Sequence, residues 1–305
     1  MGNRINTTPV KTKKWIVNFD FNISRNINSI QSISEFYPRE SSVGLPAQGS
    51  YKSFLIIGNP FGSYYGFKYK GVYKDADATI ARDQNGKEIV GPNGQTIYMR
   101  YNYPTVDYVF QPGDAMYEDI NHDGNIDEKD MVYLGNSVPK FTGGFGPSVI
   151  FNGNLKVQAF FSYRYGYDIV NTAKITTTNM YGVNNQSTAV LRRWRNPGDV
   201  TDMPRALYGV GYNWLGSDRY VEDASFIRLS SVTVRYNFTQ NMLKRVGVKS
   251  ASIYVTGQNL YTWTKYTGQD PDVTSVGSSN PFSYAADGSL TPPSKTFTMG
   301  LTLGL

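Results

Sequence analysis

Seven segments of the chain alternate apolar and polar side chains with the two-residue period of a β-strand. In the first segment, Trp15, Val17 and Phe19 belong to one face, whereas Asn18 and Asp20 belong to the other. The segments cover residues 15–24, about 64–73, 141–151, 155–165, 226–238, 251–263 and 296–305. This pattern predicts an all-β fold in which every strand carries one apolar face and one polar face.

The connections between these strands are very unequal in length. Asn152-Gly153-Asn154 reads as a tight hairpin turn, and residues 239–250 read as a modest turn with a short helix over 241–246. Short turns at one end of a sheet and long loops at the other are typical of an antiparallel transmembrane β-barrel of the outer membrane. We therefore predict long extracellular loops at about 74–139, 166–224 and 265–295.

Strand length and the placement of aromatic residues favour this barrel over the alternative, a soluble β-sandwich. The strands run about ten residues, which is the length that a tilted membrane strand needs. Aromatic side chains stand near the strand ends, as in the girdles at membrane interfaces. They are Trp15, Phe151, Tyr165, Phe238, Tyr261 and Trp263.

Composition narrows the function classes. The chain has 305 residues, with 24 Tyr, 16 Phe and 30 Gly and a charged fraction of 18%. The absence of Cys excludes disulfides, zinc–thiolate sites and thiol catalysis. The net charge of +6 is not gathered into a nucleic-acid motif, so we expect no nucleic-acid partner. The N-terminus lacks an apolar signal core, so an exported protein would need a longer precursor than this chain.

One loop has the spacing of a calcium site. Gly124 stands at loop position six and Ile126 at position eight, as in a calcium loop, although no flanking helices are predicted. Oxygen side chains occupy the alternate positions: Asp119, Asn121, Asp123, Asn125, Asp127 and Asp130. We predict a structural calcium ion here. The alternative is an Asx-rich turn closed by its own side-chain-to-backbone hydrogen bonds.

Other candidate chemistry is weak. His122, the single His, is expected to be an exposed loop residue because no catalytic partner is identifiable. The carboxylates at 75–83 and 218–223 show no hydrolase pairing, so no enzyme activity is predicted. Ser187 is expected to begin a short helix that ends at 192–195. Four aromatic residues of the long 166–224 loop, expected either to stack on sugars or to pack the loop, are Trp194, Tyr208, Tyr212 and Trp214.

Five further stretches are informative as longer motifs: residues 61–71, 113–127, 134–145, 217–229 and 255–271. Together, and in this order, they resemble the C-terminal part of SusC/RagA-type TonB-linked outer-membrane transporters. The resemblance implies a barrel of about 22 strands around a plug, of which residues 1–305 would be the C-terminal portion without the plug. It also implies import of glycans or oligopeptides across the outer membrane of Bacteroidota, with a SusD-like surface lipoprotein and TonB as partners and membrane lipid around the barrel.

The sequence therefore predicts a transporter rather than an enzyme. Its polar strand faces would line the lumen through Gln158, Ser162, Arg164, Thr233, Arg235, Thr256 and Gln258. The alternative from another class is a calcium-stabilised extracellular β-rich binding or adhesion module. Membrane partition of the protein distinguishes the two.

Overall fold

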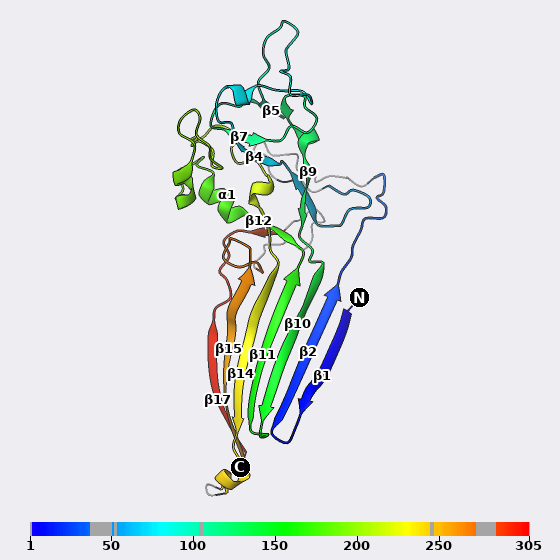
Figure 1. The fold of residues 1–305 in the computed structure, drawn as a ribbon, viewed down its shortest axis with the longest axis vertical. Coiled ribbons are helices and arrows are strands. Elements are labelled where there is room, and N and C mark those ends of the chain that lie inside the picture. The colour runs from blue at the N-terminus through cyan, green and yellow to red at the C-terminus, as the bar shows by residue number, and fades with distance from the viewer. Residues whose placement is uncertain are drawn as a thin grey trace.

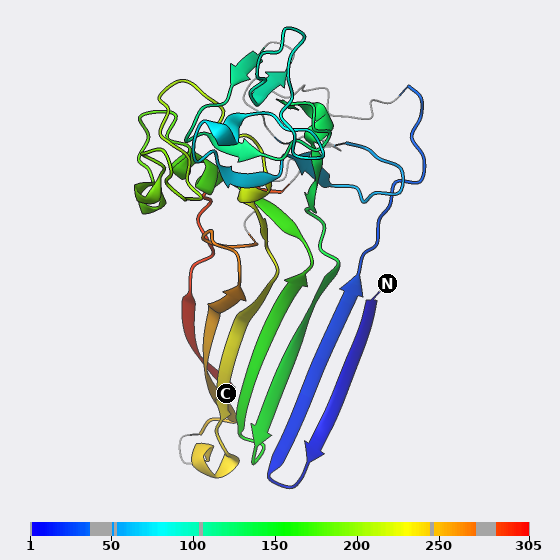
Figure 2. The same cartoon turned by 45° about the horizontal axis from the view of Figure 1, so that its top comes forward.

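The computed structural model describes residues 2–36, 51, 54–103, 106–244, 247–272 and 285–304. These residues form two regions, which Figures 1 and 2 show one above the other. The lower region is a sheet of long strands. The upper region, here called the cap, consists of the described residues of 26–140, 166–225 and 265–295. Its elements are short and are joined by long loops.

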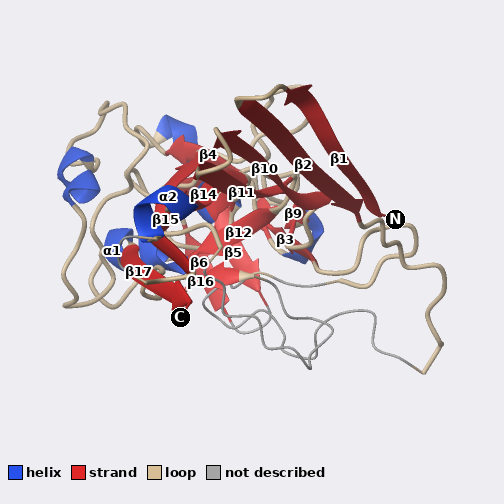
Figure 3. Cartoon of the chain, turned by 90° about the horizontal axis from the view of Figure 1, so that it is seen from below, coloured by secondary structure: helices blue, strands red, loops and turns tan. Residues whose placement is uncertain are grey.

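The lower region is a seven-stranded antiparallel sheet with the order β1-β2-β10-β11-β14-β15-β17. Its strands are β1 (Gly2–Lys11), β2 (Trp15–Arg25), β10 (Phe141–Phe151), β11 (Leu155–Tyr165), β14 (Phe226–Asn237), β15 (Ser250–Thr264) and β17 (Thr296–Gly304). The strands predicted over these ranges from β2 onward are confirmed, with ends that differ by one residue at most, and Leu305 lies outside the described residues. Seen from below, β1 and β17 form the two edges (Figure 3).

One predicted strand of the sheet is wrong. Residues 64–73 lie in the cap, where β3 (Ser63–Gly66) pairs with β9 (Val132–Asn136) and β4 (Tyr69–Val72) pairs with β7 (Ala115–Tyr117). The physical reason is burial, because all four residues of β3 are buried and neither face is free to contact solvent or lipid. The remaining strand of the sheet is β1, which was not predicted. Its residues are mostly polar and do not form an alternating hydrophobic pattern.

Cross-strand register collects the apolar side chains of the sheet on one face. A single row of partners crosses all seven strands through Val10, Val17, Val149, Val157, Val234, Val255 and Met299. The row is well exposed, with 41% of Val234 and 74% of Met299 accessible. Because paired residues on neighbouring strands point to the same side, the apolar face is continuous and uncovered.

The lower connections are short, as predicted. Asn152 and Gly153 both have positive φ, and the Asn154 amide donates to the Phe151 carbonyl at 3.0 Å, as in a type I′ turn. The predicted helix over 241–246 is observed as α2 (Gln240–Leu243), and residues 245–246 lie outside the described part. The turn between β14 and β15 therefore also lies at the lower end (Figure 1).

The cap is assembled from short strands and helical turns. Besides the four strands above, it holds η1 (Asp77–Thr79), β5 (Arg100–Tyr103), β6 (Val106–Val109), β8 (Asn125–Ile126), η2 (Glu128–Asp130), β12 (Asp168–Asn171), α1 (Thr172–Thr178), η3 (Thr188–Arg192), η4 (Asp218–Tyr220), β13 (Val221–Asp223) and β16 (Ala286–Asp287). Two small sheets have the orders β6-β5-β8 and β13-β12-β16. Among the described residues, no helix is long and apolar enough to cross a membrane.

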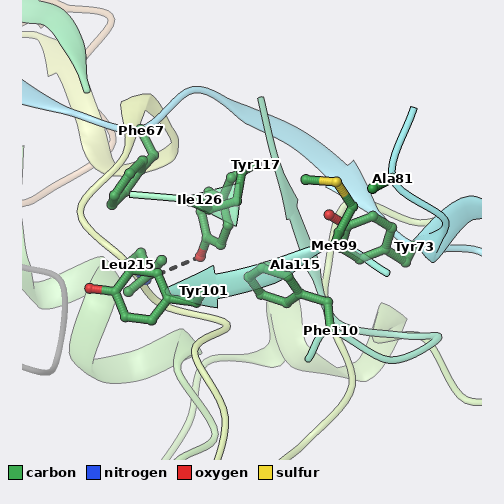
Figure 4. Packing of buried hydrophobic residues seen from close by; sticks show 10 residues of the cluster. All are labelled: Phe67, Tyr73, Ala81, Met99, Tyr101, Phe110, Ala115, Tyr117, Ile126 and Leu215. Atoms are coloured by element: carbon green, nitrogen blue, oxygen red, sulfur yellow. Dashed lines mark hydrogen bonds between the residues drawn. The ribbon is translucent and has the colours of Figure 1, made fainter. Parts of the chain in front are cut away.

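The largest buried core lies in the cap. Its members are Phe67, Tyr73, Ala81, Met99, Tyr101, Phe110, Ala115, Tyr117, Ile126 and Leu215 (Figure 4). Tyr117 ties this core to a distant loop, because its hydroxyl donates to the Tyr212 carbonyl at 3.0 Å and accepts the Leu215 amide at 3.1 Å. Buried tyrosines thus supply both apolar area and hydrogen bonds to loop backbone.

Candidate functional site

The polar face of the sheet carries all seven residues predicted to line a lumen. Register places Gln158 beside Thr233, and Thr233 beside Thr256. The two threonine hydroxyls lie 2.9 Å apart, and the Ser162 and Ser230 hydroxyls lie 2.7 Å apart. Hydroxyl, amide and guanidinium groups therefore gather on the face opposite the valine row, as the alternation predicted.

Two aromatic residues on this polar face were not predicted. A Cβ placed on Gly144 would lie 2.7 Å from the Phe160 ring, and one on Gly300 would lie 2.4 Å from the Tyr254 ring. Each aromatic ring therefore covers a glycine of the neighbouring strand. Phe160 has the parity of Gln158 and Ser162, so alternation along β11 places it on the polar side; the register shift beside it comes from an extra residue on β14, between Leu229 and Ser231.

A buried ion-pair cluster joins the polar face to the cap. Arg228 is 7% exposed, and its Nη2 lies 2.5 Å from Oδ1 of Asp270, which is 6% exposed. Asp272 pairs with both Arg228, at 3.6 Å, and Arg164, at 2.6 Å. The Tyr167 hydroxyl donates to the Pro271 carbonyl at 2.9 Å. Arginines on β11 and β14 thus hold residues 270–272 against the top of the sheet.

Arg164 was predicted as a lumen residue, whereas Arg228, Asp270 and Asp272 were not singled out. By strict alternation Arg228 shares the parity of the apolar residues Val232 and Val234, and only the irregularity between Leu229 and Ser231 places it on the polar side. No local pattern connects that position with an aspartate 42 residues later. The pairing is a property of the tertiary fold.

The predicted calcium loop folds into a compact turn. Asp119 accepts the backbone amides of Asp123 at 3.2 Å and Gly124 at 2.7 Å. Gly124 has φ +84°, and a Cβ there would lie 2.9 Å from the Ala81 Cβ, so the expected need for glycine is confirmed. Ile126 is fully buried in the cap core, as expected. The glycine and the isoleucine fasten the loop to the cap.

The remaining oxygens of the loop are engaged with the loop itself. Asp130 accepts the amides of Ile120 at 2.8 Å and Asp127 at 2.9 Å. Asp123 accepts the Asn125 amide at 2.8 Å, and the Lys129 ammonium lies 3.7 Å from it. Among the described residues, no three His, Cys, Asp or Glu side chains are grouped as metal ligands. The side-chain oxygens of the loop are suitable ligands for calcium. The loop also closes by its own hydrogen bonds, as in the alternative of an Asx-rich turn. Calcium binding therefore stays a prediction.

The pKa values of two of these carboxyls, Asp130 and Asp123, are shifted in opposite directions. Burial raises the pKa of Asp130 to about 6, against the lowering effect of its two backbone hydrogen bonds. Burial would also raise the pKa of Asp123, but hydrogen bonds from Asn125 and Asn121 and the charge of Lys129 lower it below its ordinary value. His122 is exposed with φ 56° at the corner of the turn, where its exposure was predicted.

The aromatic residues of the long 166–224 loop mostly pack the cap. Tyr212 contacts Tyr101 with ring centroids 4.8 Å apart, and Trp214 contacts Tyr181 at 5.3 Å. The Trp194 indole donates to the Lys74 carbonyl at 3.2 Å. Tyr208 differs, with 74% of its surface exposed. Of the two uses considered for these residues, packing of the loop is observed for three, and Tyr208 is available for contacts outside the chain.

The helix predicted from Ser187 is also present in part. Ser187 caps η3 by accepting the Ala189 amide at 3.3 Å, and the helix is of the 3-10 type and ends at Arg192. Arg192 then forms a bidentate pair with Asp202 at 2.6 and 3.0 Å. Its exposed position makes this pair a surface contact within the loop.

Solved structures of known transporters share this combination of long antiparallel strands, a polar face and a large cap. The RagAB peptide transporter matches with a TM-score of 0.69 at 20% identity, covering 99% of this chain and 28% of that chain. The RagAB peptide importer in its open-open state matches with a TM-score of 0.67 at 19% identity, covering 100% and 28%. These likenesses concern the fold.

Sequence comparison then gives the particular relatives. TonB-dependent receptor P3 of Formosa agariphila is 27% identical over 98% of this chain and 28% of its own length. TonB-dependent receptor SusC of Bacteroides thetaiotaomicron is 25% identical over 98% of this chain and 25% of its own length. No protein-family model matches the chain. The chain is a homologue of these TonB-dependent receptors, which confirms the SusC/RagA resemblance, and it spans about a quarter of their length.

Proposed function

We propose that the chain forms part of a TonB-dependent importer that carries nutrients across the outer membrane. The observation that carries this proposal is the register of the sheet, which keeps an exposed apolar row and a polar row on opposite faces across seven strands. In a transmembrane barrel the apolar face contacts lipid and the polar face contacts the aqueous lumen. The cap then lies on the extracellular side.

The substrate class and partners follow from the relatives and belong to the same proposal. Two matched structures are of the RagAB peptide transporter, and one relative is the TonB-dependent receptor SusC. We infer that the substrate is a glycan or an oligopeptide, that a SusD-like lipoprotein covers the cap, and that TonB supplies the driving force. Exposed Tyr208 and the polar residues of the sheet are the groups on this chain that are available to such ligands.

Fractionation and uptake test this function. We expect the protein in the outer-membrane fraction, and we expect uptake of a labelled glycan or oligopeptide to be lost when either this gene or tonB is deleted. A protein found only in the soluble fraction would support the calcium-stabilised binding or adhesion module instead. A protein in the outer membrane whose loss leaves uptake of both substrate classes unchanged would contradict the import function.

We also propose that the loop from Asp119 to Asp130 binds one calcium ion with a structural role. Support comes from the ligand spacing and from the compact turn that already brings Asp119 close to Asp123. Isothermal titration of the purified protein with calcium is expected to show one site that is lost in Asp119→Ala. Asp107→Ala, an exposed cap carboxylate paired with Arg100, is the matched control. If titration of the wild-type protein with calcium releases or absorbs no heat of binding, the loop is a hydrogen-bonded turn without a metal site.

A further inference from the structure

We propose that a cavity in the cap binds a carboxylate group of an acidic oligopeptide. The inference rests on the proposed import function and adds to it one chemical group that the importer recognises on its solute. The cavity has a volume of about 560 Å³ and lies between α1, η3 and the residues around Asp202, Arg219 and Thr267. A space of this size can enclose a small ligand.

The feature that selects an anion is the guanidinium of Arg219, which lines the cavity. Its Nη2 donates to the thioether sulfur of Met203 at 2.9 Å, and its Nη1 is buried without a hydrogen-bond partner. A thioether sulfur is a weak acceptor. Within the described part of the chain, this guanidinium therefore has no oxygen acceptor and no carboxylate within ion-pair distance.

Two tyrosine rings hold the guanidinium in place. Its central carbon lies 4.9 Å from the centre of the Tyr69 ring and 5.3 Å from the centre of the Tyr220 ring. Cation–π contacts attract the guanidinium without neutralising its charge. Arg219 is therefore a fixed positive charge at the cavity wall, which reduces the conformational entropy lost when an anion binds.

The other charged residues of the cavity are paired. Arg192 lies 2.6 and 3.0 Å from the two carboxylate oxygens of Asp202, and Lys174 lies 3.0 Å from Glu222. Asp202 belongs to the lining, whereas Glu222 contacts the cavity only through its partner Lys174. Three cations thus face two carboxylates, and the surplus positive charge is that of Arg219.

The acidic neighbours of Arg219 are engaged elsewhere. Asp218 precedes it in the chain but does not line the cavity, and its carboxylate accepts the Tyr69 amide at 2.8 Å. The pKa of Asp202 is lowered chiefly by its hydrogen bond from Arg192, with a smaller contribution from the charge of Arg219. An anion that enters the cavity therefore does not have to displace a carboxylate from the Arg219 guanidinium.

Neutral donors complete the site. The Ser187 hydroxyl accepts the Ala189 amide at 3.3 Å, which leaves its own proton available for a ligand oxygen. The Asn171 side-chain amide donates to Glu222 and Thr267 at 3.4 Å each, which is long for such bonds, so this amide retains donor capacity. Guanidinium, hydroxyl and amide donors around one cavity suit the oxygens of a carboxylate.

The lining favours a peptide over a sugar. Tyr69 is the aromatic residue of this cavity; Arg219 covers its ring, and Tyr117 packs against it with ring centroids 6.1 Å apart. A sugar ring is held best by an open aromatic face, which Tyr69 does not offer. A peptide brings, besides its carboxylate, backbone groups that can hydrogen-bond to the hydroxyls of the lining.

Isothermal titration of the intact protein, purified from its membrane in mild detergent, tests the site. The probe is the peptide acetyl-Ala-Ala-Glu, compared with acetyl-Ala-Ala-Gln-amide, which has the same length and no carboxylate. The acidic peptide is expected to bind more tightly, and Arg219→Gln should weaken its binding about tenfold, because a charge-assisted hydrogen bond is lost. Arg195→Gln, which removes an exposed arginine outside the lining, is the matched control and should bind like the wild type.

A second pair of variants tests the cavity and leaves Arg219 in place. Ala189 is part of the lining. Ala189→Glu adds a carboxylate that competes for the guanidinium, so it should weaken binding of the acidic peptide more than Ala189→Gln, which adds the same bulk without the charge. This comparison stands even where Arg219→Gln fails to fold.

Three results would overturn the proposal: equal binding of the two peptides, unchanged binding in a folded Arg219→Gln variant, or equal effects of the two Ala189 variants. Tighter binding of trigalacturonate than of the acidic peptide would also overturn it, because the cavity would then belong to an acidic glycan. Binding to the purified protein does not require transport. Arg219-dependent peptide binding by a protein whose deletion leaves uptake unchanged would therefore contradict the proposed function and support this site.

Discussion

The sheet and the cap use the same apolar residue types in opposite ways. In the cap, Tyr64, Tyr101 and Leu215 are fully buried, whereas in the sheet Leu301 and Met299 are 61% and 74% exposed. The cap encloses its own core, but the apolar side chains of the sheet need an external phase to cover them. The difference shows that hydrophobic residues identify a protein core only when the surrounding chain can enclose them.

Aromatic geometry separates the two regions as well. Phe145 and Phe161 of the sheet are stacked on neighbouring strands, with centroids 4.6 Å apart and planes at 9°. In the cap, Tyr65 meets Tyr133 edge to face at 5.9 Å and 80°. Regular cross-strand register lets neighbouring rings of the sheet stack with nearly parallel planes. The irregular interior of the cap is filled by rings that meet edge to face.

The largest expected effect is at the ion pair that connects the regions. Arg228→Ala should lower the free energy of unfolding by ~3–5 kcal/mol, because it leaves the buried Asp270 carboxylate without its partner. Denaturant titration of the protein in lipid vesicles measures this change. Arg192→Ala removes an exposed bidentate pair and should cost about 1 kcal/mol or less. Equal effects of the two variants would mean that the Arg228 pair is not a buried connection.

The next effect separates the cap core from the exposed apolar surface of the sheet. Leu215→Ala should destabilise the cap by ~2–5 kcal/mol because it opens a cavity in a closed core. Leu301→Ala removes the same side chain from an exposed site and should have a much smaller effect. Tryptophan fluorescence of Trp194 and Trp214 reports the cap transition. A larger loss of stability in Leu301→Ala than in Leu215→Ala would contradict the assignment of Leu215 to a core and Leu301 to a surface.

The third prediction compares an arginine introduced on the apolar face of β11 with one introduced on its polar face. Val157→Arg places a cation in the middle of the apolar face and should cost ~2–4 kcal/mol in a bilayer. Gln158→Arg places it on the polar face of the same strand and should be nearly neutral. Refolding yield and stability in lipid vesicles measure both. If Gln158→Arg proved the more damaging, the faces would be oppositely assigned.

The smallest expected effect concerns pH at the boundary of the regions. Burial alone would raise the pKa of Glu222, but hydrogen bonds from Thr267 and the Lys174 ammonium lower this pKa below its ordinary value. A carboxyl with a lowered folded-state pKa contributes stability above its unfolded value, and that contribution is lost as the pH falls through the folded value. Wild-type stability should therefore fall more steeply in acid than that of Glu222→Gln, by less than about 1.4 kcal/mol per pH unit. Parallel pH profiles would contradict this role.

Sequence reasoning succeeded where structure depends on local periodicity. The ranges of β10 and β11 and the turn between them follow from alternation and from Asn152-Gly153. The positions of Gly124 and Ile126 likewise follow from loop spacing. Each of these features is decided by neighbours in the chain, so a single sequence contains the information.

Cap structure could not be predicted in the same way because its contacts are distant in sequence. β12 (168–171) lies between β13 (221–223) and β16 (286–287), and each strand is only two to four residues long. The pairing of Arg228 with Asp270 is equally non-local. β1 was missed for a different reason, since an edge strand with few apolar residues leaves a weak hydrophobic pattern.

The two edge strands have a consequence for the proposed membrane location. β1 and β17 each pair with one neighbour, so their outer rows of backbone N–H and C=O groups have no strand partner among the described residues. Hydrocarbon cannot hydrogen-bond those groups, and an open edge in lipid would cost several kcal/mol for each of them. If the sheet lies in a bilayer as we propose, its insertion has to be cooperative, because it can enter only together with partners that close its edges; in water the same edges would direct aggregation.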